Sequence, residues 1–394
     1  MTAARGGPAA LASPFEAAAS YHGVGWCPPS LGEAGFRPQD GPVGRSLPML
    51  ESRRARASAV PARPGDFVPD APLRDGRGRL YSYVRLSLTD RCDMACVYCM
   101  PAGGEAEHGE RRELLSDDEI TRLVAVLSRA GVRRVRLTGG EPLIRRGVPA
   151  LVARMREAGA AEVVLTTNAS LLVRHAEALA SAGLSTVNVS IDSLDAERFR
   201  AITRGGDLSA VIAGIDRARE VGLRVKTNTV VLGGVNDDEL VAIAEWAWAR
   251  DVTPRFIELM PLGEDASLAK ERFVSAAQMR TVLGMSDDHG EPDALAGPAR
   301  YAIGRGGRVG FITAVSDEFC GTCNRIRITS HGELRACLAD RAAVSLRDAM
   351  RSSASDADLA WSIAWALGAK AEGHTFTSEH EREHERVGMS LIGG

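Results

Sequence analysis

Lysine is almost absent from this chain. It occurs only at positions 226, 270 and 370 of the 394 residues, so nearly all of the 48 basic side chains are arginine. The formal net charge is −3, which gives no general attraction to nucleic acid or to an anionic membrane surface. No apolar run approaches the roughly 18–20 residues of a membrane-spanning helix, and the N-terminus lacks the apolar core of a signal peptide. We therefore expect a cytoplasmic protein with no nucleic-acid or membrane partner.

The cysteines do not form an even set. Seven are present, and Cys27 stands alone as an incidental thiol. An odd count in a reducing compartment argues against a disulfide framework and for metal or cluster binding. The other cysteines fall into two sets of three, Cys92, Cys96, Cys99 and Cys320, Cys323, Cys337.

The composition divides the chain into three parts. Residues 1–78 hold 11 of the 18 prolines and 11 of the 41 glycines, with few periodic apolar residues. Such a segment buries too little to offset its ordering entropy, so we expect a mostly disordered extension. Residues 79–297 alternate between short β-branched runs and amphipathic stretches, and the pattern changes again over 298–394.

The alternating part predicts six β-then-α units. The expected strands are 80–88, 132–138, 163–167, 186–191, 224–232 and 253–260. The expected helices follow near 116–127, 148–158, 171–182, 195–201 with 208–221, 237–250 and 267–283. Ser116 and Glu119 form a capping box for the first helix. Further helices are expected near 344–352 and 356–369. Serial βα units imply a parallel sheet with right-handed crossovers, and six are too few for an eight-fold barrel. We expect an α/β fold, a partial (βα)6 TIM-like barrel over 79–297, with a small C-terminal α+β region over 298–394.

The first cysteine set follows the first expected strand at C-x-x-x-C-x-x-C spacing. Three thiolates can hold three irons of a cubane cluster, which leaves the fourth iron for a small molecule, whereas such clusters are usually held by four cysteines. The alternative is structural zinc, which needs a fourth ligand from elsewhere, for example from the second set.

The second set supplies three more thiolates, and its function is open between a structural knuckle and a substrate site. Arg325 and Arg327 follow Cys323 on a short expected strand, so both project to one face. Two guanidiniums beside an iron make a good site for a polyphosphate. A third metal motif, His380-Glu381-Arg382-Glu383-His384, has the H-E-x-x-H pattern of zinc proteases, but it is charged all round and we interpret it as a solvated link.

Several motifs carry a family resemblance. Residues 85–100, RLSLTDRCDMACVYCM, resemble the cluster loop of radical S-adenosylmethionine (SAM) enzymes, and Gly139-Gly140-Glu141-Pro142 resembles their motif for the SAM amino group, where a buried carboxylate could meet an ammonium. The segments TGGEPLIRR, TTNASLL, NVSIDSLDAERFRAITR, VKTNTVVLGGVND, RFIELMPLGE and FCGTCNRIRITSHGELRACL, with the closing IGG, are similar to the GTP 3′,8-cyclase family, which starts molybdenum cofactor biosynthesis. The resemblance covers residues 80–394.

The resemblance implies the following roles. One 4Fe–4S cluster lies on Cys92, Cys96 and Cys99, and a second on Cys320, Cys323 and Cys337. SAM contacts Tyr98, Gly140, Ser190 and Met260. GTP contacts Arg85, Arg136, Thr166, Lys226, Arg325 and Arg327. The tail residues Gly393 and Gly394 enter the active site and, with Arg325 and Arg327, serve catalysis, while the part played by Arg386 stays open.

The implied reaction cyclises GTP to (8S)-3′,8-cyclo-7,8-dihydroguanosine 5′-triphosphate. A 5′-deoxyadenosyl radical from SAM takes the hydrogen of ribose C3′, and the C3′ radical attacks C8 of guanine. The implied partners are an electron donor and the downstream cyclic pyranopterin monophosphate synthase, and a homodimer is an open option. The alternatives are another two-cluster radical SAM enzyme, such as a peptide maturase, and a non-catalytic iron–sulfur or zinc protein.

Overall fold

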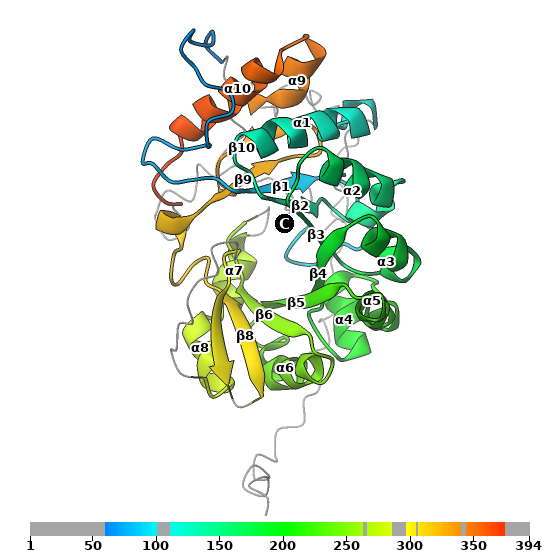
Figure 1. Ribbon diagram of the computed structural model, residues 1–394. Coiled ribbons are helices and arrows are strands. Elements are labelled where there is room, and N and C mark those ends of the chain that lie inside the picture. Colours follow the sequence, from blue (N-terminus) through cyan, green and yellow to red (C-terminus); the bar gives the residue numbers. More distant parts are fainter. Residues whose placement is uncertain are drawn as a thin grey trace, which may run out of the picture. The chain divides into compact units, whose positions relative to one another are not determined.

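One mixed sheet organises the part of the chain that the structure describes. The computed structural model describes residues 60–100, 111–262, 266–285, 297–304, 306–339 and 344–374 (Figure 1). Within them the sheet has 11 strands in the order β11-β10-β9-β1-β2-β3-β4-β5-β6-β8-β7. The six strands from β1 to β6 are neighbours in chain order and pair in parallel.

The central six strands and the helices on their outer side form the partial barrel. The strands are β1 (Tyr83–Ser87), β2 (Arg134–Thr138), β3 (Glu162–Thr167), β4 (Leu184–Ser190), β5 (Arg224–Val231) and β6 (Thr253–Glu258). The helices are α1 (Asp117–Arg129), α2 (Val148–Glu157), α3 (Leu172–Ser181), α4 (Ala196–Thr203), α5 (Leu208–Glu220) and α6 (Leu240–Trp248). Figure 1 shows these helices on the outside of the curved sheet.

The C-terminal strands extend this sheet at both edges. After α7 (Ala266–Arg272) and α8 (Ala276–Val282), β8 (Gly307–Ile312) pairs in parallel with β6, and β7 (Arg300–Gly304) is antiparallel to β8. At the other edge β9 (Arg325–Ile328) is parallel to β1, followed by the antiparallel β10 (Glu333–Arg335) and β11 (Val344–Ser345). Helices α9 (Leu346–Arg351) and α10 (Asp356–Gly368) complete the described part.

The structure confirms the expected partial barrel and refines the rest. The capping box at the start of α1 is present: Ser116 Oγ accepts from the Glu119 N–H at 3.1 Å, and the Glu119 carboxylate accepts from the Ser116 N–H at 2.8 Å. One helix was expected over 267–283, and two short helices are found. The C-terminal region does not build a sheet of its own, because β9 continues the barrel sheet next to β1.

Part of the expected N-terminal extension is ordered against the barrel. Residues 1–59 lie outside the described residues. In the following stretch, Leu73 is buried and its N–H donates to the Ala130 carbonyl at 3.0 Å, and the Phe67 ring meets the Trp361 ring edge-on. The boundary at residue 78 otherwise stays a prediction.

Side chains alternate along each strand with a period of two residues, so one set faces the helices and the other faces the barrel interior. In β1, Val84 and Leu86 are fully buried in the large hydrophobic core beneath the helices. Tyr83 and Arg85 alternate with them and therefore face the other side of the sheet, where both line a cavity. None of the helices in the described part of the chain is long and apolar enough to cross a membrane.

Phe311 tests the packing of the β8 edge, where a second hydrophobic core lies under α6 and α8. Its side chain is fully buried, and its ring lies 6.4 Å from the Phe256 ring and under the Arg280 guanidinium. Phe311→Ala should lower the stability by about 3–5 kcal/mol because a buried ring is replaced by a cavity. Ile303→Ala on the neighbouring β7 is the matched control, since that side chain is 71% exposed. Urea denaturation of both variants measures the difference, and equal midpoints would contradict it.

Candidate functional site

A single cavity brings both cysteine sets together. All six clustered cysteines line it, with Tyr83, Arg85, Arg136, Thr166, Arg325 and Arg327, and the four positions expected to contact SAM. These side chains come from β1 and the loop after it, from β2 to β6 and the loops that follow them, from β9 with its flanking loops, and from the loop after β10. The first cysteine set thus lies at the carboxyl end of β1, and its binding role stays a prediction.

The first cysteine loop is pinned to the end of α4. The N–H groups of Ala95 and Val97 donate to the carbonyls of Thr203 and Ile202 at 3.1 and 3.0 Å. Cys92 Sγ accepts from the Met94 N–H at 3.4 Å, and the Asn168 amide lies 3.8 Å from it. Burial raises the pKa of the Cys92 thiol to about 12. The hydrogen bonds of the loop fix the positions of the sulfur atoms, and a bound metal would be needed to keep them deprotonated as thiolates.

Gly139 and Gly140 allow the turn after β2 to lie directly against this loop. Backbone hydrogen bonds join Gly140 N–H to the Thr89 carbonyl at 2.8 Å and Glu141 N–H to the Arg91 carbonyl at 2.7 Å. A Cβ on Gly140 would lie 2.2 Å from the Arg91 carbonyl oxygen, so only glycine fits. The two glycines line the cavity through their backbone.

The Glu141 carboxylate accepts three hydrogen bonds at the ends of β2 and β3. It accepts from Leu143 N–H at 3.0 Å, Thr167 Oγ1 at 2.8 Å and Asn168 N–H at 2.7 Å. It is fully buried and is not among the described residues that line the cavity. The carboxylate therefore joins the ends of β2 and β3, and the backbone of Gly139 and Gly140 is what faces a ligand.

The four residues expected to contact SAM line the same cavity as the cysteines. Tyr98, Gly140, Ser190 and Met260 all line the cavity. Tyr98 donates a hydrogen bond of 2.6 Å from its hydroxyl to Asp192, whose pKa is raised to about 6 by burial. This pair ties the cysteine loop to the end of β4.

The second cysteine set lies at the opposite end of the same strands. Tyr83, the first residue of β1, pairs with Arg325, the first residue of β9, so the strands run side by side in the same direction. Cys323 precedes β9, whereas Cys92 follows β1. Cys337 follows β10, which is antiparallel to β9, and so returns to the Cys323 end. The cavity therefore runs between a cysteine set at each end of β1.

Both sets have the donor chemistry of an iron–sulfur site. Each supplies three thiols and surrounds them with hydrogen-bond donors, which are among the groups that tune such clusters. Around Cys323 the donors are charged: Arg325 and Lys370 approach its sulfur at 3.6 and 3.7 Å. Burial alone would raise the pKa of Cys323, but these two positive charges outweigh it and lower the pKa to about 7.

A row of arginines crosses the sheet between the two cysteine sets. The strand register places Arg335, Arg327, Arg85 and Arg136 side by side on β10, β9, β1 and β2. Like charges directly opposite each other are destabilising in a sheet. Burial and the charge of Arg327 hold the pKa of Arg85 well below its usual range, and burial and the charge of Arg325 lower the pKa of Arg327 to about 10. The row is suited to a ligand with several negative charges.

Arg255 on β6 adds a further positive charge to the cavity, and the sequence analysis did not predict it. Its guanidinium lies in the cavity wall, and two of its nitrogens have no hydrogen-bond partner among the described residues. Gly310 on β8 makes room for it, since a Cβ there would lie 2.7 Å from Arg255 Cγ. An arginine between apolar neighbours in the middle of an expected strand, TPRFIE, was the signal that could have found it.

Not every expected residue reaches the cavity. Lys226 contacts Tyr301, with its ammonium 3.2 Å from the phenol oxygen, and is not among the described lining residues. Its pKa is lowered by burial. The tail residues Gly393 and Gly394, Arg386 and the charged motif at 380–384 lie outside the described residues, as does Cys27.

The different pKa values of the cysteine thiols can be tested by alkylation. In metal-free protein at pH 7 we expect iodoacetamide to alkylate Cys323 well before Cys92 or Cys96, because the thiolate is the reactive form and only Cys323 has a lowered pKa. The rate at Cys323 should reach half of its maximum near pH 7, and Arg325→Gln should move this midpoint to higher pH. Peptide mass spectrometry measures each site. Arg154→Gln on α2 is the control, and equal rates at the three thiols would contradict the assignment.

Two family models match consecutive parts of the chain. The Radical SAM superfamily model matches residues 86–247, and the Molybdenum Cofactor Synthesis C model matches residues 252–376. The fold also resembles the crystal structure of Streptococcus suis SuiB bound to S-adenosylmethionine, with a TM-score of 0.51 and 16% identity over 66% of this chain and 60% of that chain. That likeness shows the fold alone.

Curated relatives match almost over their full length. A GTP 3′,8-cyclase of Rhodopseudomonas palustris (strain TIE-1) is 44% identical over 334 residues, 82% of this chain and 96% of the relative. The enzyme of the same name from Caulobacter vibrioides is 44% identical over 86% of this chain and 98% of its own, and that from Heliobacterium modesticaldum is 44% identical over 81% and 99%. With both halves matched in order and this degree of identity, the chain belongs to the GTP 3′,8-cyclase family of radical SAM proteins.

Proposed function

We propose that this protein cyclises GTP to (8S)-3′,8-cyclo-7,8-dihydroguanosine 5′-triphosphate, the first step of molybdenum cofactor biosynthesis. The observation that carries the proposal is the shared cavity, which has a three-cysteine set at each end and a row of arginines between them. Only a reaction that needs two metal centres and a polyanionic substrate uses all three features.

The cofactors follow from the two ends of the cavity. Membership in the radical SAM family means the use of SAM and an iron–sulfur cluster, and Cys92, Cys96 and Cys99 would hold that cluster. A second cluster on Cys320, Cys323 and Cys337 is part of the proposal. Bound at the first site, the cluster and SAM supply a 5′-deoxyadenosyl radical, a chemistry that side chains alone cannot provide.

The chain's own residues then position the substrates. Gly139 and Gly140 allow close approach of SAM, and Tyr98, Ser190 and Met260 line its side of the cavity. Arg85, Arg136, Thr166, Arg325 and Arg327 line the cavity that joins the two cysteine sets, where Arg255 adds charge. We assign the triphosphate to these guanidiniums, because charge-assisted bonds to phosphate are strong and often bidentate.

The charge of the cavity favours a nucleotide over a peptide substrate. Five arginines line it, at positions 85, 136, 255, 325 and 327, against the acids Asp192 and Glu258. Glu258 is occupied by the N–H groups of Ala276, Val315 and Ser316 at 2.8–2.9 Å, and Asp192 by Tyr98. A peptide maturase has no comparable need for so many guanidiniums.

The proposal has further parts that the family resemblance implies. Gly393 and Gly394 would enter the cavity, Lys226 would contact GTP after leaving Tyr301, and Arg325 and Arg327 would serve catalysis by holding the substrate. An electron donor, the downstream cyclic pyranopterin monophosphate synthase, a homodimer and a cytoplasmic location complete it.

The proposed function predicts a measurable cyclisation of GTP. Anaerobically reconstituted protein incubated with SAM, GTP and a strong reductant should form 5′-deoxyadenosine in step with GTP consumption. With GTP deuterated at C3′, one deuterium should appear in 5′-deoxyadenosine, because the hydrogen moves from that carbon. Liquid chromatography with mass spectrometry measures both products.

Two outcomes would contradict the proposal. Formation of 5′-deoxyadenosine without GTP consumption would mean that the substrate is wrong. Bound zinc without iron and sulfide would rule out the enzyme altogether. About eight irons per chain is the expected content, since each cubane cluster holds four.

The arginines of the cavity give a further prediction, on the affinity for GTP. Arg255→Gln and Arg327→Gln should each weaken GTP binding by about 10- to 150-fold, the equivalent of the roughly 1.5–3 kcal/mol of a hydrogen bond to a charged group. SAM binding should be unchanged, because its residues lie at the other end of the cavity. Anaerobic titration calorimetry with each ligand measures both, and Arg154→Gln on α2 is the control. An equal loss of SAM and GTP affinity would indicate a general structural defect instead.

A further inference from the structure

The segment that follows α10 is held against the second cysteine loop. The Arg79 guanidinium donates to the carbonyls of Cys320, Ala371 and Glu372 at 2.7, 2.9 and 2.9 Å. Arg79 is itself fixed by an ion pair with Asp75, whose side chain is fully buried. The Arg79 side chain thus links the segment after α10 to the second cysteine loop.

The close approach continues at the next two residues. A Cβ added to Gly373 would lie 3.7 Å from the Cβ of Cys320 and 3.3 Å from a carboxylate oxygen of Glu318. Glycine at this position therefore lets the backbone lie directly on the loop. The backbone N–H of His374 donates to the Cys320 sulfur, which places the imidazole beside the cysteine.

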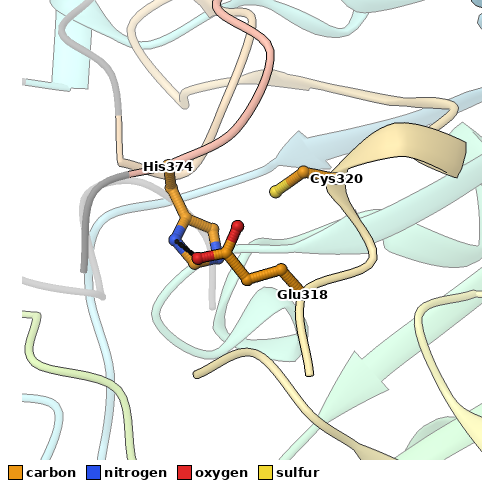
Figure 2. Close-up of side chains that lie close together, drawn as sticks. All are labelled: Glu318, Cys320 and His374. Carbon is orange, nitrogen blue, oxygen red and sulfur yellow. Dashed lines mark ion pairs between the residues drawn. The ribbon is translucent and has the colours of Figure 1, made fainter. Parts of the chain in front are cut away.

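His374, Glu318 and Cys320 form a cluster of three metal-ligand side chains (Figure 2). Their ligand atoms all lie within 4.8 Å of one another, and the imidazole is buried, with only 6% of the side chain exposed. His374 Nδ1 lies 3.5 Å from Glu318 Oε1. A carboxylate beside one ring nitrogen is the arrangement that orients metal-binding histidines and presents the other nitrogen to the metal.

Cys320 already has a place in the proposed function, as a ligand of the second cluster. Three cysteines hold three irons of a cubane, so the fourth iron takes a ligand of another kind. His374 lines the cavity together with all three cysteines of this set. A ring nitrogen of His374 and Cys320 Sγ lie within 4.8 Å of each other, so the imidazole is close enough to the second cysteine set to reach a metal centre bound there.

We propose that His374, oriented by Glu318, is an exchangeable ligand of the second cluster, which occupies the iron that no cysteine holds until GTP replaces it. The inference rests on the proposed function, since it requires that cluster. In the exchange the iron–imidazole bond breaks and a bond from iron to a donor atom of GTP forms, with no net change in electrons. The imidazole stays close to Glu318 when it leaves. The cluster is thereby shielded from water and small ligands between turnovers.

Isotope labelling tests the bond directly. The full-length protein is produced with histidine that carries ¹⁵N only in the imidazole ring, so that the backbone N–H of His374, which donates to the Cys320 sulfur, stays unlabelled. It is then reconstituted anaerobically, supplied with SAM and reduced. Pulsed electron paramagnetic resonance should then show a ¹⁵N coupling to a reduced cluster. Addition of unlabelled GTP should remove the ¹⁵N coupling and replace it with a ¹⁴N coupling.

Matched variants assign the coupling to one residue. His374→Gln should lack the ¹⁵N signal while keeping the full iron and sulfide content, and His175→Gln on α3 should keep the signal. Glu318→Ala should weaken it, because the ring is no longer oriented. Two clusters without any ¹⁵N coupling that depends on His374 would overturn this inference and leave the proposed function intact. A single cluster per chain would overturn both the two-cluster proposal and the inference.

Discussion

The close packing of arginines inside the barrel is the constraint on which the site depends. Arg335, Arg327, Arg85 and Arg136 stand at one register on four adjacent strands, and Arg255 faces the same cavity. Burial lowers the pKa values of Arg85, Arg327 and Arg255, and the charges of neighbouring guanidiniums lower them further. The surrounding cores must supply the stability that this row removes. A polyanion that enters the cavity relieves the repulsion, so the same feature that weakens the empty protein strengthens substrate binding.

One strand sets the geometry of the whole site. β1 carries the first cysteine set after its last residue, while its first residue pairs with the strand that follows the second cysteine pair. With a rise of about 3.3 Å per residue, the five residues of β1 keep the two sets roughly 13 Å or more apart. A substrate that contacts both ends must therefore be elongated. A nucleotide triphosphate has this shape, with a base that can reach one end while its phosphates lie along the arginine row.

Local sequence patterns predicted most of the barrel and only part of the site. The six strands, the capping box of α1 and the two cysteine sets each leave a signal within a few residues of the chain. The pairing of β9 with β1 leaves none, because it joins residues that are more than two hundred positions apart, and it is this pairing that aligns Arg85 with Arg327. Arg255 was missed for a related reason: its importance comes from the glycine opposite it on β8. Glu141 is a further case that local pattern could not supply, since its carboxylate joins the ends of two strands that are separate in sequence.

The two ends of the cavity differ in how they stabilise a thiolate, and this difference fits their proposed roles. At the first end burial dominates, so the pKa values of Cys92 and Cys96 are raised and the sulfurs depend on the metal for their charge. At the second end Arg325 and Lys370 supply positive charge to Cys323. Positive charge near a cluster favours its more reduced, more negative state. A centre surrounded by such groups is suited to holding an anionic substrate. Cys92 and Cys96 are instead buried beside acids, among them Glu141 and Asp192, and negative neighbours make a cluster the stronger electron donor. This contrast supports the proposal that SAM is cleaved at the first end and GTP is bound at the second.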